Sequence, residues 1–370
     1  MNRLAHLDAL RGIAALLVVW QHTSESFVKL PGVAERGSWL ADVAWSVDFG
    51  RIGVVCFFLI SGFIIPYSFS SGPGAVRTFA IRRFFRLYPV YWASVVLAVL
   101  VGSAFAAHSW DTATLVANFT MIQKIIGYSH IQGLYWTLQV ELIFYLLCGG
   151  IFYFGKMRSV PFLILATALL LVLFVGAELA FRTVLKGSDF PSELQYIPYF
   201  LSIMFCGAII REIFLGEHSL HNRLIFALAP AAVFGIPAMV LFLYSLGFQF
   251  TQEPIRFGVS YLMALGIFIA AMFVRWPVPK PLAWLGLISY SIYLFHPVSM
   301  VLIRWAQRQP WAGFTESWGL WMYMSVAAAI TIVLATVTYY VIERPSIRLG
   351  RYFSLRGATP STHMIVQRGT

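Results

Sequence analysis

Residues 160–181 read VPFLILATALLLVLFVGAELAF, with Glu178 as the single charged side chain. A helix needs about 20 mostly apolar residues to cross the hydrocarbon core of a bilayer, and this run has that length. It lacks the alternation of apolar and polar residues that is typical of the strands of an outer-membrane barrel. The stretch therefore predicts a transmembrane helix.

Further runs of the same character lie on both sides of this stretch. They cover residues 8–26, 51–70, 88–107, 134–154, 196–215, 224–246, 257–274, 282–304 and 319–342. Of the 370 residues, 59% are hydrophobic and 11% are charged, and the mean hydropathy is +0.78. A soluble domain has roughly a quarter of its residues charged, so this composition excludes a disordered or ordinary soluble protein. We expect an all-α polytopic membrane protein with about ten transmembrane helices.

The run 8–26 is the weakest of these, because Arg11 and His22 interrupt it. A secretory signal peptide is the alternative interpretation. No small-residue cleavage site follows the run, and polar residues in membrane helices are usually functional, so we favour a retained helix.

The net charge of +11 indicates the orientation. With ten spans and the N-terminus in the cytoplasm, most of the 26 Lys and Arg residues fall in cytoplasmic loops and tails, as the positive-inside rule requires. We therefore expect cytoplasmic N- and C-termini, a location in the inner membrane of a bacterium, and no nucleic-acid partner. Residues 1–350 form the membrane domain, and residues 351–370 form a short, basic, flexible cytoplasmic tail.

The three cysteines, Cys56, Cys148 and Cys206, lie singly within apolar runs. No C-x-x-C pair and no Cys/His spacing typical of a zinc site is found in the sequence. We expect neither a disulfide framework nor a bound metal.

The first run carries three charged or titratable side chains: Asp8, Arg11 and His22. Arg11 and His22 are eleven residues apart, so on a helix they share a face and lie roughly 16 Å apart along the axis. Asp8 lies close to that face. The face could line a narrow channel from an inner Arg to an outer His, or the two side chains could simply reach toward the two headgroup layers.

Two other runs carry polar groups in the hydrocarbon region. Glu141 lies in the run 134–154, and His296 precedes Pro297 in the run 282–304. With the orientation above, His22, Glu141 and His296 share the outer half of the bilayer, which favours a common site over separate interhelical hydrogen bonds. Pro297 should leave a backbone carbonyl of its helix free.

An arginine cluster precedes the run 88–107. Arg82, Arg83 and Arg86 are spaced so that they can converge on one ligand from a helix. Guanidinium groups suit phosphates, but such a cluster also serves as an anchor to anionic lipid, and the residues alone leave both interpretations open.

Taken in order, these motifs resemble the membrane-bound acyltransferase-3 family. The residues that carry the resemblance are LDALRGIAA at 7–15 with His22, GVVCFFLISGF at 53–63, RRFFRLYP at 82–89, WTLQVE at 136–141, SYSIYLFHP at 289–297 and ERP at 343–345. Order and spacing agree over residues 4–350. The Arg and His separated by ten residues are the family's signature.

The resemblance implies an O-acyltransferase that moves an acyl group, usually acetyl from acetyl-CoA, to a hydroxyl of a surface carbohydrate or its lipid-linked precursor. It implies a cytoplasmic donor and chemistry toward the other side of the membrane. Some relatives append a soluble esterase-like domain, which we expect this chain to lack. Either the membrane domain alone completes the transfer, or a separate periplasmic partner protein does.

Residue roles follow from combining the resemblance with the chemistry. We expect CoA phosphates on Arg82, Arg83 and Arg86, and a pantetheine arm that passes Arg11 along the small-residue face of the first helix. His22 would act as general base, and Glu141 would orient or balance it. Candidate oxyanion donors are Tyr290, Ser289 and Ser61, and His296 is a second acid/base or a packing residue. The alternative is a proton-coupled transporter or exporter of a glycan or small solute, in which His22, Glu141 and His296 form a proton relay.

Overall fold

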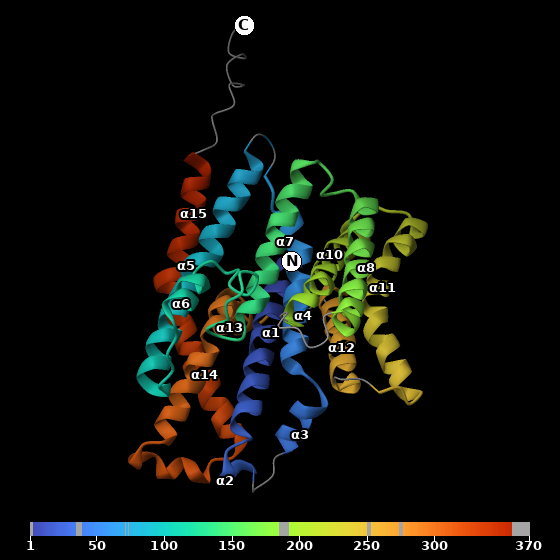
Figure 1. Cartoon of the computed structure of the whole chain (residues 1–370). Coiled ribbons are helices and arrows are strands. Elements are labelled where there is room, and N and C mark those ends of the chain that lie inside the picture. The colour runs from blue at the N-terminus through green and yellow to red at the C-terminus, as the bar shows by residue number, and fades with distance from the viewer. Residues whose placement is uncertain are drawn as a thin grey trace.

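The structure is a computed structural model that describes residues 3–34, 39–70, 72, 74–184, 192–249, 253–273 and 277–356. Over these residues every regular element is helical (Figure 1). The long helices are α1 (Arg3–Phe27), α4 (Phe49–Ile64), α5 (Ala75–Ala106), α7 (Tyr135–Tyr153), α8 (Val160–Thr183), α10 (Ile197–Leu215), α11 (Leu220–Ser245), α12 (Pro254–Phe273), α13 (Lys280–Gln307) and α14 (Leu320–Thr338). The short elements are α2 (Pro31–Ala34), α3 (Trp39–Ser46), η1 (Ile65–Tyr67), α6 (Thr112–Asn118), α9 (Ser192–Gln195), η2 (Pro310–Ser317), the π-helical turn η3 (Tyr339–Glu343) and α15 (Arg344–Arg356).

Within the described residues, nine helical segments are long and apolar enough to cross a membrane. The first predicted span, residues 8–26, is not among them, yet it forms the continuous 25-residue helix α1. The predicted all-α polytopic fold is confirmed, and the chain is a multi-pass membrane protein.

Two helix boundaries differ from the prediction by much more than the few residues seen elsewhere. Helix α5 begins at Ala75 instead of residue 88, so the arginine cluster lies inside the helix. The last span does not end at residue 342, because η3 joins α14 and α15 into one segment, Leu320–Leu355. Pro345 has no N–H to donate to the preceding turn, and a π-helical turn next to it lets the helix continue.

The predicted cytoplasmic tail begins at residue 351. Helix α15 includes its first six residues and ends at Arg356, and residues 357–370 lie outside the described residues.

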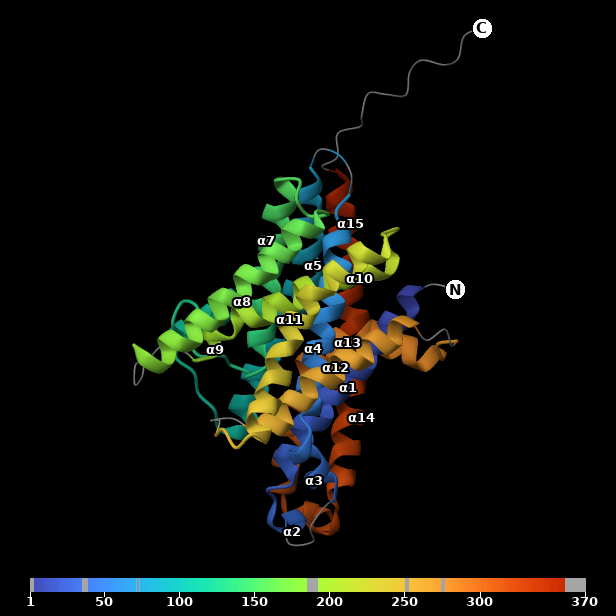
Figure 2. The same ribbon diagram turned by 90° about the vertical axis from the view of Figure 1, so that its right-hand side faces the viewer.

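In the middle of the molecule, α1 packs against α4 and α13, and α4 packs in turn against α10 (Figures 1 and 2). Helix α8, formed by the stretch quoted first, lies at the periphery and exposes Leu165, Leu169 and Val172, as a lipid-facing helix should. The C-terminal end of α15 lies at one end of the molecule, and α2 and α3 lie at the other (Figures 1 and 2). We call these the α15 end and the α3 end.

Glycines set the spacing around α1. A Cβ atom on Gly53 would clash with the carbonyl oxygen of Ala14, and a Cβ atom on Gly286 would clash with that of Asp8. Helices α4 and α13 therefore both approach the backbone of α1 closely. This contact holds the helix that carries Arg11 and His22 at the centre of the bundle.

Candidate active site

Two cavities lie in the middle of the bundle. The first, which we call the arginine cavity, has a volume of about 100 Å³. Its polar lining consists of Arg11, Ser61, Arg83, Arg86, Thr137, Glu141, Tyr145, Tyr290 and Tyr293. The second, which we call the histidine cavity, has a volume of about 400 Å³. Its lining includes His22, Asp48, Arg51, Trp136, Phe200, Tyr293 and Pro297.

The two cavities share one wall. Val54 of α4 and Tyr293 of α13 line both of them. The Tyr293 hydroxyl is fixed by the Thr137 hydroxyl at 2.8 Å and by the carbonyl oxygen of Leu134 at 3.2 Å. Thus two side chains from two helices form the boundary between the arginine cavity and the histidine cavity.

His22 pairs with His296 across the α1–α13 contact. Nδ1 of His22 lies 2.8 Å from Nε2 of His296, and Nδ1 of His296 lies 2.7 Å from the carbonyl oxygen of Tyr293. In an uninterrupted helix that carbonyl would accept the N–H of residue 297, but Pro297 has none. The free carbonyl expected from the sequence is therefore used to bind His296.

When both imidazoles are neutral, these contacts determine which ring nitrogen of His22 and of His296 carries the proton. A carbonyl oxygen only accepts, so Nδ1 of His296 carries the proton and its Nε2 is left as an acceptor. Nδ1 of His22 then donates to that acceptor, which leaves Nε2 of His22 without a proton. His296 is fully buried, and burial disfavours a charged form of the pair. His22 lines the histidine cavity and can accept a proton there.

Glu141 does not fill the position that the sequence suggested. Its carboxylate accepts hydrogen bonds from Tyr145 at 2.5 Å and from Ser61 at 3.5 Å. It lines the arginine cavity, whereas His22 lines the histidine cavity. The prediction that Glu141 orients His22 is corrected: His296 makes that contact, because α13 and not α7 packs against this face of α1.

The three arginines of α5 do not converge. Arg83 and Arg86 line the arginine cavity, whereas Arg82 donates to the Ser354 hydroxyl of α15 at 3.0 Å. Arg83 donates to the Ser68 hydroxyl at 2.6 Å and lies over the Phe79 and Tyr145 rings. Two of the three predicted donor-binding arginines are thus positioned to meet one ligand.

Arg86 forms an ion pair that was not predicted. Its NH1 lies 2.9 Å from Oε1 of Glu343, a fully buried residue of the π-helical turn, and Ser291 donates to Oε2 of the same carboxylate at 2.7 Å. Glu343 lies just after the last predicted span, residues 319–342. The Pro345 that follows it was the available signal that the helix backbone is irregular at this point.

Arg11 lines the arginine cavity and, among the described residues, has no hydrogen bond or ion pair. The charged groups that act on it are the like-charged Arg86 and the carboxylates of Asp8, Glu141 and Glu343. The face of α1 between Arg11 and His22 does not form one continuous channel, since Ala15 is fully buried and packs with Ile288 and Ile292, whereas Val18 lines the histidine cavity. The open space runs instead beside α4.

The three candidate oxyanion donors differ in position. Ser61 and Tyr290 line the arginine cavity, although Tyr290 donates to the carbonyl oxygen of Leu87 at 3.0 Å. Ser289 is fully buried and donates to the carbonyl oxygen of Gly286 in its own helix at 2.9 Å. Ser289 is therefore placed for helix packing and does not line either cavity.

Comparison with known proteins gives relatives along most of the chain. Nodulation protein 10 of Rhizobium leguminosarum bv. viciae is 25% identical, over 93% of each chain. The exopolysaccharide production protein ExoZ of Rhizobium meliloti is 26% identical, over 82% of this chain and 91% of its own. The peptidoglycan O-acetyltransferase OatA of Listeria monocytogenes is 25% identical over 92% of this chain, which spans 55% of OatA. No solved structure matches significantly.

The family model for the acyltransferase domain of the acyltransferase-3 family matches residues 4–340. That range contains α1 from its second residue through α14 and every residue that lines the two cavities, whereas Glu343 lies just beyond it. The chain therefore belongs to the acyltransferase-3 family and is a membrane acyltransferase.

Proposed function

We propose that this protein is an O-acetyltransferase that moves an acetyl group from cytoplasmic acetyl-CoA to a carbohydrate hydroxyl on the opposite side of the membrane. One observation carries the proposal. The cation-lined arginine cavity and the histidine cavity meet at Val54 and Tyr293. Such a pair of spaces suits a donor that enters from one side and an acceptor that enters from the other.

The arginine cavity suits the donor. Arg83 and Arg11 offer guanidinium groups to the phosphates and the polar arm of CoA, and Arg86 adds a third cation whose charge Glu343 balances. Glu141 provides the counter-charge near Arg11. The α15 end is then the cytoplasmic end, which agrees with the basic residues of α5 and α15 and with a bacterial inner membrane.

The histidine cavity suits the reaction. Nε2 of His22 takes the proton of the acceptor hydroxyl while that oxygen attacks the thioester carbonyl carbon. The new C–O bond forms, the C–S bond breaks, and the CoA thiolate takes the proton back from the His22 imidazolium. A general base contributes typically 10²- to 10⁴-fold to such a rate.

The acceptor class follows from the relatives. One is named for exopolysaccharide production and another for peptidoglycan O-acetylation. We propose a surface or lipid-linked carbohydrate as acceptor.

Purified protein in liposomes, supplied with radiolabelled acetyl-CoA and a panel of glycans, tests this function. Label on a sugar hydroxyl is the expected result. Movement of an unmodified solute without labelling of any sugar would contradict the proposal and indicate an exporter.

A further inference from the structure

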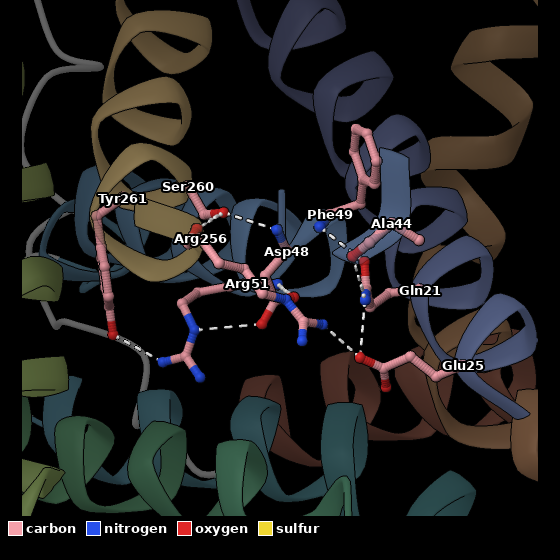
Figure 3. A network of polar contacts seen from close by, with 9 residues as sticks. All are labelled: Gln21, Glu25, Ala44, Asp48, Phe49, Arg51, Arg256, Ser260 and Tyr261. Carbon is pink, nitrogen blue, oxygen red and sulfur yellow. Dashed lines mark hydrogen bonds and ion pairs between the residues drawn. The ribbon is translucent and has the colours of Figure 1, made fainter. Parts of the chain in front are cut away.

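The histidine cavity has a polar pair in its wall in addition to His22. Asp48 lies just before α4 and Arg51 lies in its first turn, where their side chains contact each other (Figure 3). Both residues line the cavity. The Asp48 side chain is 14% exposed and that of Arg51 is 29% exposed. Both groups are therefore within reach of a ligand in the cavity, although neither lies at the open surface.

Both side chains keep unused hydrogen-bonding capacity. Asp48 Oδ1 accepts the backbone N–H of Arg51 at 2.8 Å, and Oδ2 accepts Nε of Arg51 at 3.4 Å, so each oxygen retains a lone pair. NH1 of Arg51 donates to the Tyr261 hydroxyl at 3.1 Å. NH2 of Arg51 has no hydrogen-bond partner among the described residues. The pair can accept from one hydroxyl and donate to the next.

A network from three helices holds this pair in place (Figure 3). Oε1 of Gln21 accepts the backbone N–H of Phe49 at 3.0 Å, and its Nε2 donates to the carbonyl oxygen of Ala44 at 3.2 Å. The Ser260 hydroxyl accepts the backbone N–H of Asp48 at 2.9 Å. Gln21 is the residue before His22, so one turn of α1 fixes both the imidazole and the segment that carries Asp48.

The charges in this network are paired. Asp48 pairs with Arg51, and Glu25 pairs with Arg256. His22 is neutral in the arrangement described above. The cavity wall thus offers hydrogen-bonding groups without an excess of either charge, which favours an uncharged ligand over a carboxylate or phosphate.

An aromatic surface completes the cavity. Trp136 is half-buried and lines the cavity together with Phe200, and the two ring centroids are 4.8 Å apart. The cavity volume of about 400 Å³ falls within the roughly 300–1,000 Å³ that is typical of small-molecule sites. A flat apolar face beside a donor–acceptor pair matches a sugar ring, which has apolar C–H faces and a rim of hydroxyls.

We infer that the histidine cavity binds an uncharged sugar residue of the acceptor, with the ring against Trp136 and two adjacent hydroxyls on Asp48 and Arg51. This inference rests on the proposed function for the donor, but it concerns only the acceptor and its recognition. Asp48 and Arg51 then decide which sugars are used, while His22 serves any hydroxyl placed beside it.

The test compares acceptor kinetics in nanodiscs with acetyl-CoA as donor. The acceptors are methyl glycosides of glucose, galactose, mannose and N-acetylglucosamine, with the uronates of glucose and galactose as charged counterparts. Asp48→Asn keeps a residue that caps a helix well, so α4 should remain folded. For the neutral glycoside that is used best, we expect KM to rise about 10- to 100-fold in Asp48→Asn and Arg51→Lys. The acetyl-CoA KM should not change.

The matched control is Asp111→Asn. Asp111 also caps a helix, α6, through a hydrogen bond from the Thr114 backbone N–H at 2.9 Å, but it lines neither cavity. Its acceptor KM should equal that of the unchanged protein. We also expect Asp48→Asn to reduce the preference for neutral glycosides over uronates.

The inference is overturned if uronates are preferred, or if Asp48→Asn and Arg51→Lys behave like Asp111→Asn. Saturation-transfer NMR of the same glycosides measures binding without turnover. If no sugar is acetylated, the proposed function fails, but glycoside binding that is lost in Asp48→Asn still supports the acceptor site. If the unchanged protein binds none of the glycosides, the acceptor site is contradicted.

Discussion

His22 and His296 form a hydrogen-bonded pair, 2.8 Å between Nδ1 and Nε2, in which the acceptor role of His296 is set by the carbonyl oxygen of Tyr293. That carbonyl is free only because Pro297 follows in the same turn of α13. A backbone irregularity in one helix therefore determines which nitrogen of an imidazole on another helix can act as a base.

Substitution of His296 tests this relationship. His296→Leu removes the acceptor for Nδ1 of His22, so we expect kcat to fall about 10- to 100-fold with little change in either KM. His296→Gln retains an amide donor and an oxygen acceptor, and should keep most of the activity. Steady-state kinetics of the two variants check this, and ¹⁵N NMR of labelled histidine reports the tautomer of His22. Equal losses in both variants would indicate a packing role only.

Substitution of Arg83 tests the donor site, and substitution of the neighbouring Arg82 is the control. Arg83 lines the arginine cavity and Arg82 contacts α15. We expect Arg83→Gln to raise the KM for acetyl-CoA about 10-fold while kcat stays close to that of the unchanged protein, because a ground-state phosphate contact is lost. Arg82→Gln should leave both constants unchanged. The reverse pattern would place the CoA phosphates on the α15 side of α5.

The buried ion pair between Arg86 and Glu343 should be visible in stability. Arg86→Leu leaves the Glu343 carboxylate buried without its cation, a change that costs roughly 3–5 kcal/mol. The double variant Arg86→Leu, Glu343→Leu should recover most of that loss. Thermal unfolding in detergent measures both, and an equally low Tm in the single and double variants would show that the pair is not coupled.

Gly53 tests the contact between α1 and α4. Gly53→Ala places a methyl group against the carbonyl oxygen of Ala14, and such overpacking costs typically 1–3 kcal/mol. Gly150→Ala in α7 is the control, since nothing lies within 4 Å of its Cβ position. We expect a lower Tm only for Gly53→Ala. A similar Tm for both variants would mean that α1 and α4 can separate without cost.

The sequence predicted the helices because hydrophobic runs of membrane length have few alternatives. It could not predict that Arg86 pairs with Glu343, because this contact forms only when η3 and α15 pack beside α5. Helical pitch also placed Arg11 and His22 on one face of α1. It could not show that α13 and α4 cover most of that face.

The depth of a residue in the membrane predicted its contacts poorly, because the contacts depend on which helices pack together. His22, Glu141 and His296 were expected at one level, but a common level does not tell which helix faces which. The structure joins His22 to His296 and places Glu141 with Ser61 and Tyr145 in the other cavity. The free carbonyl expected from Pro297 could be predicted because it depends only on residues of one helix.

The most direct measurement of the central claim is the sidedness of transfer in proteoliposomes of uniform orientation. Radiolabelled acetyl-CoA is supplied on the α15 side, and a neutral methyl glycoside is sealed on the α3 side. We predict that acetylated glycoside accumulates on the α3 side, and that His22→Ala, although folded and inserted, reduces its rate about 10²- to 10⁴-fold. Product on the side of the CoA, or an unchanged rate in His22→Ala, would contradict the account.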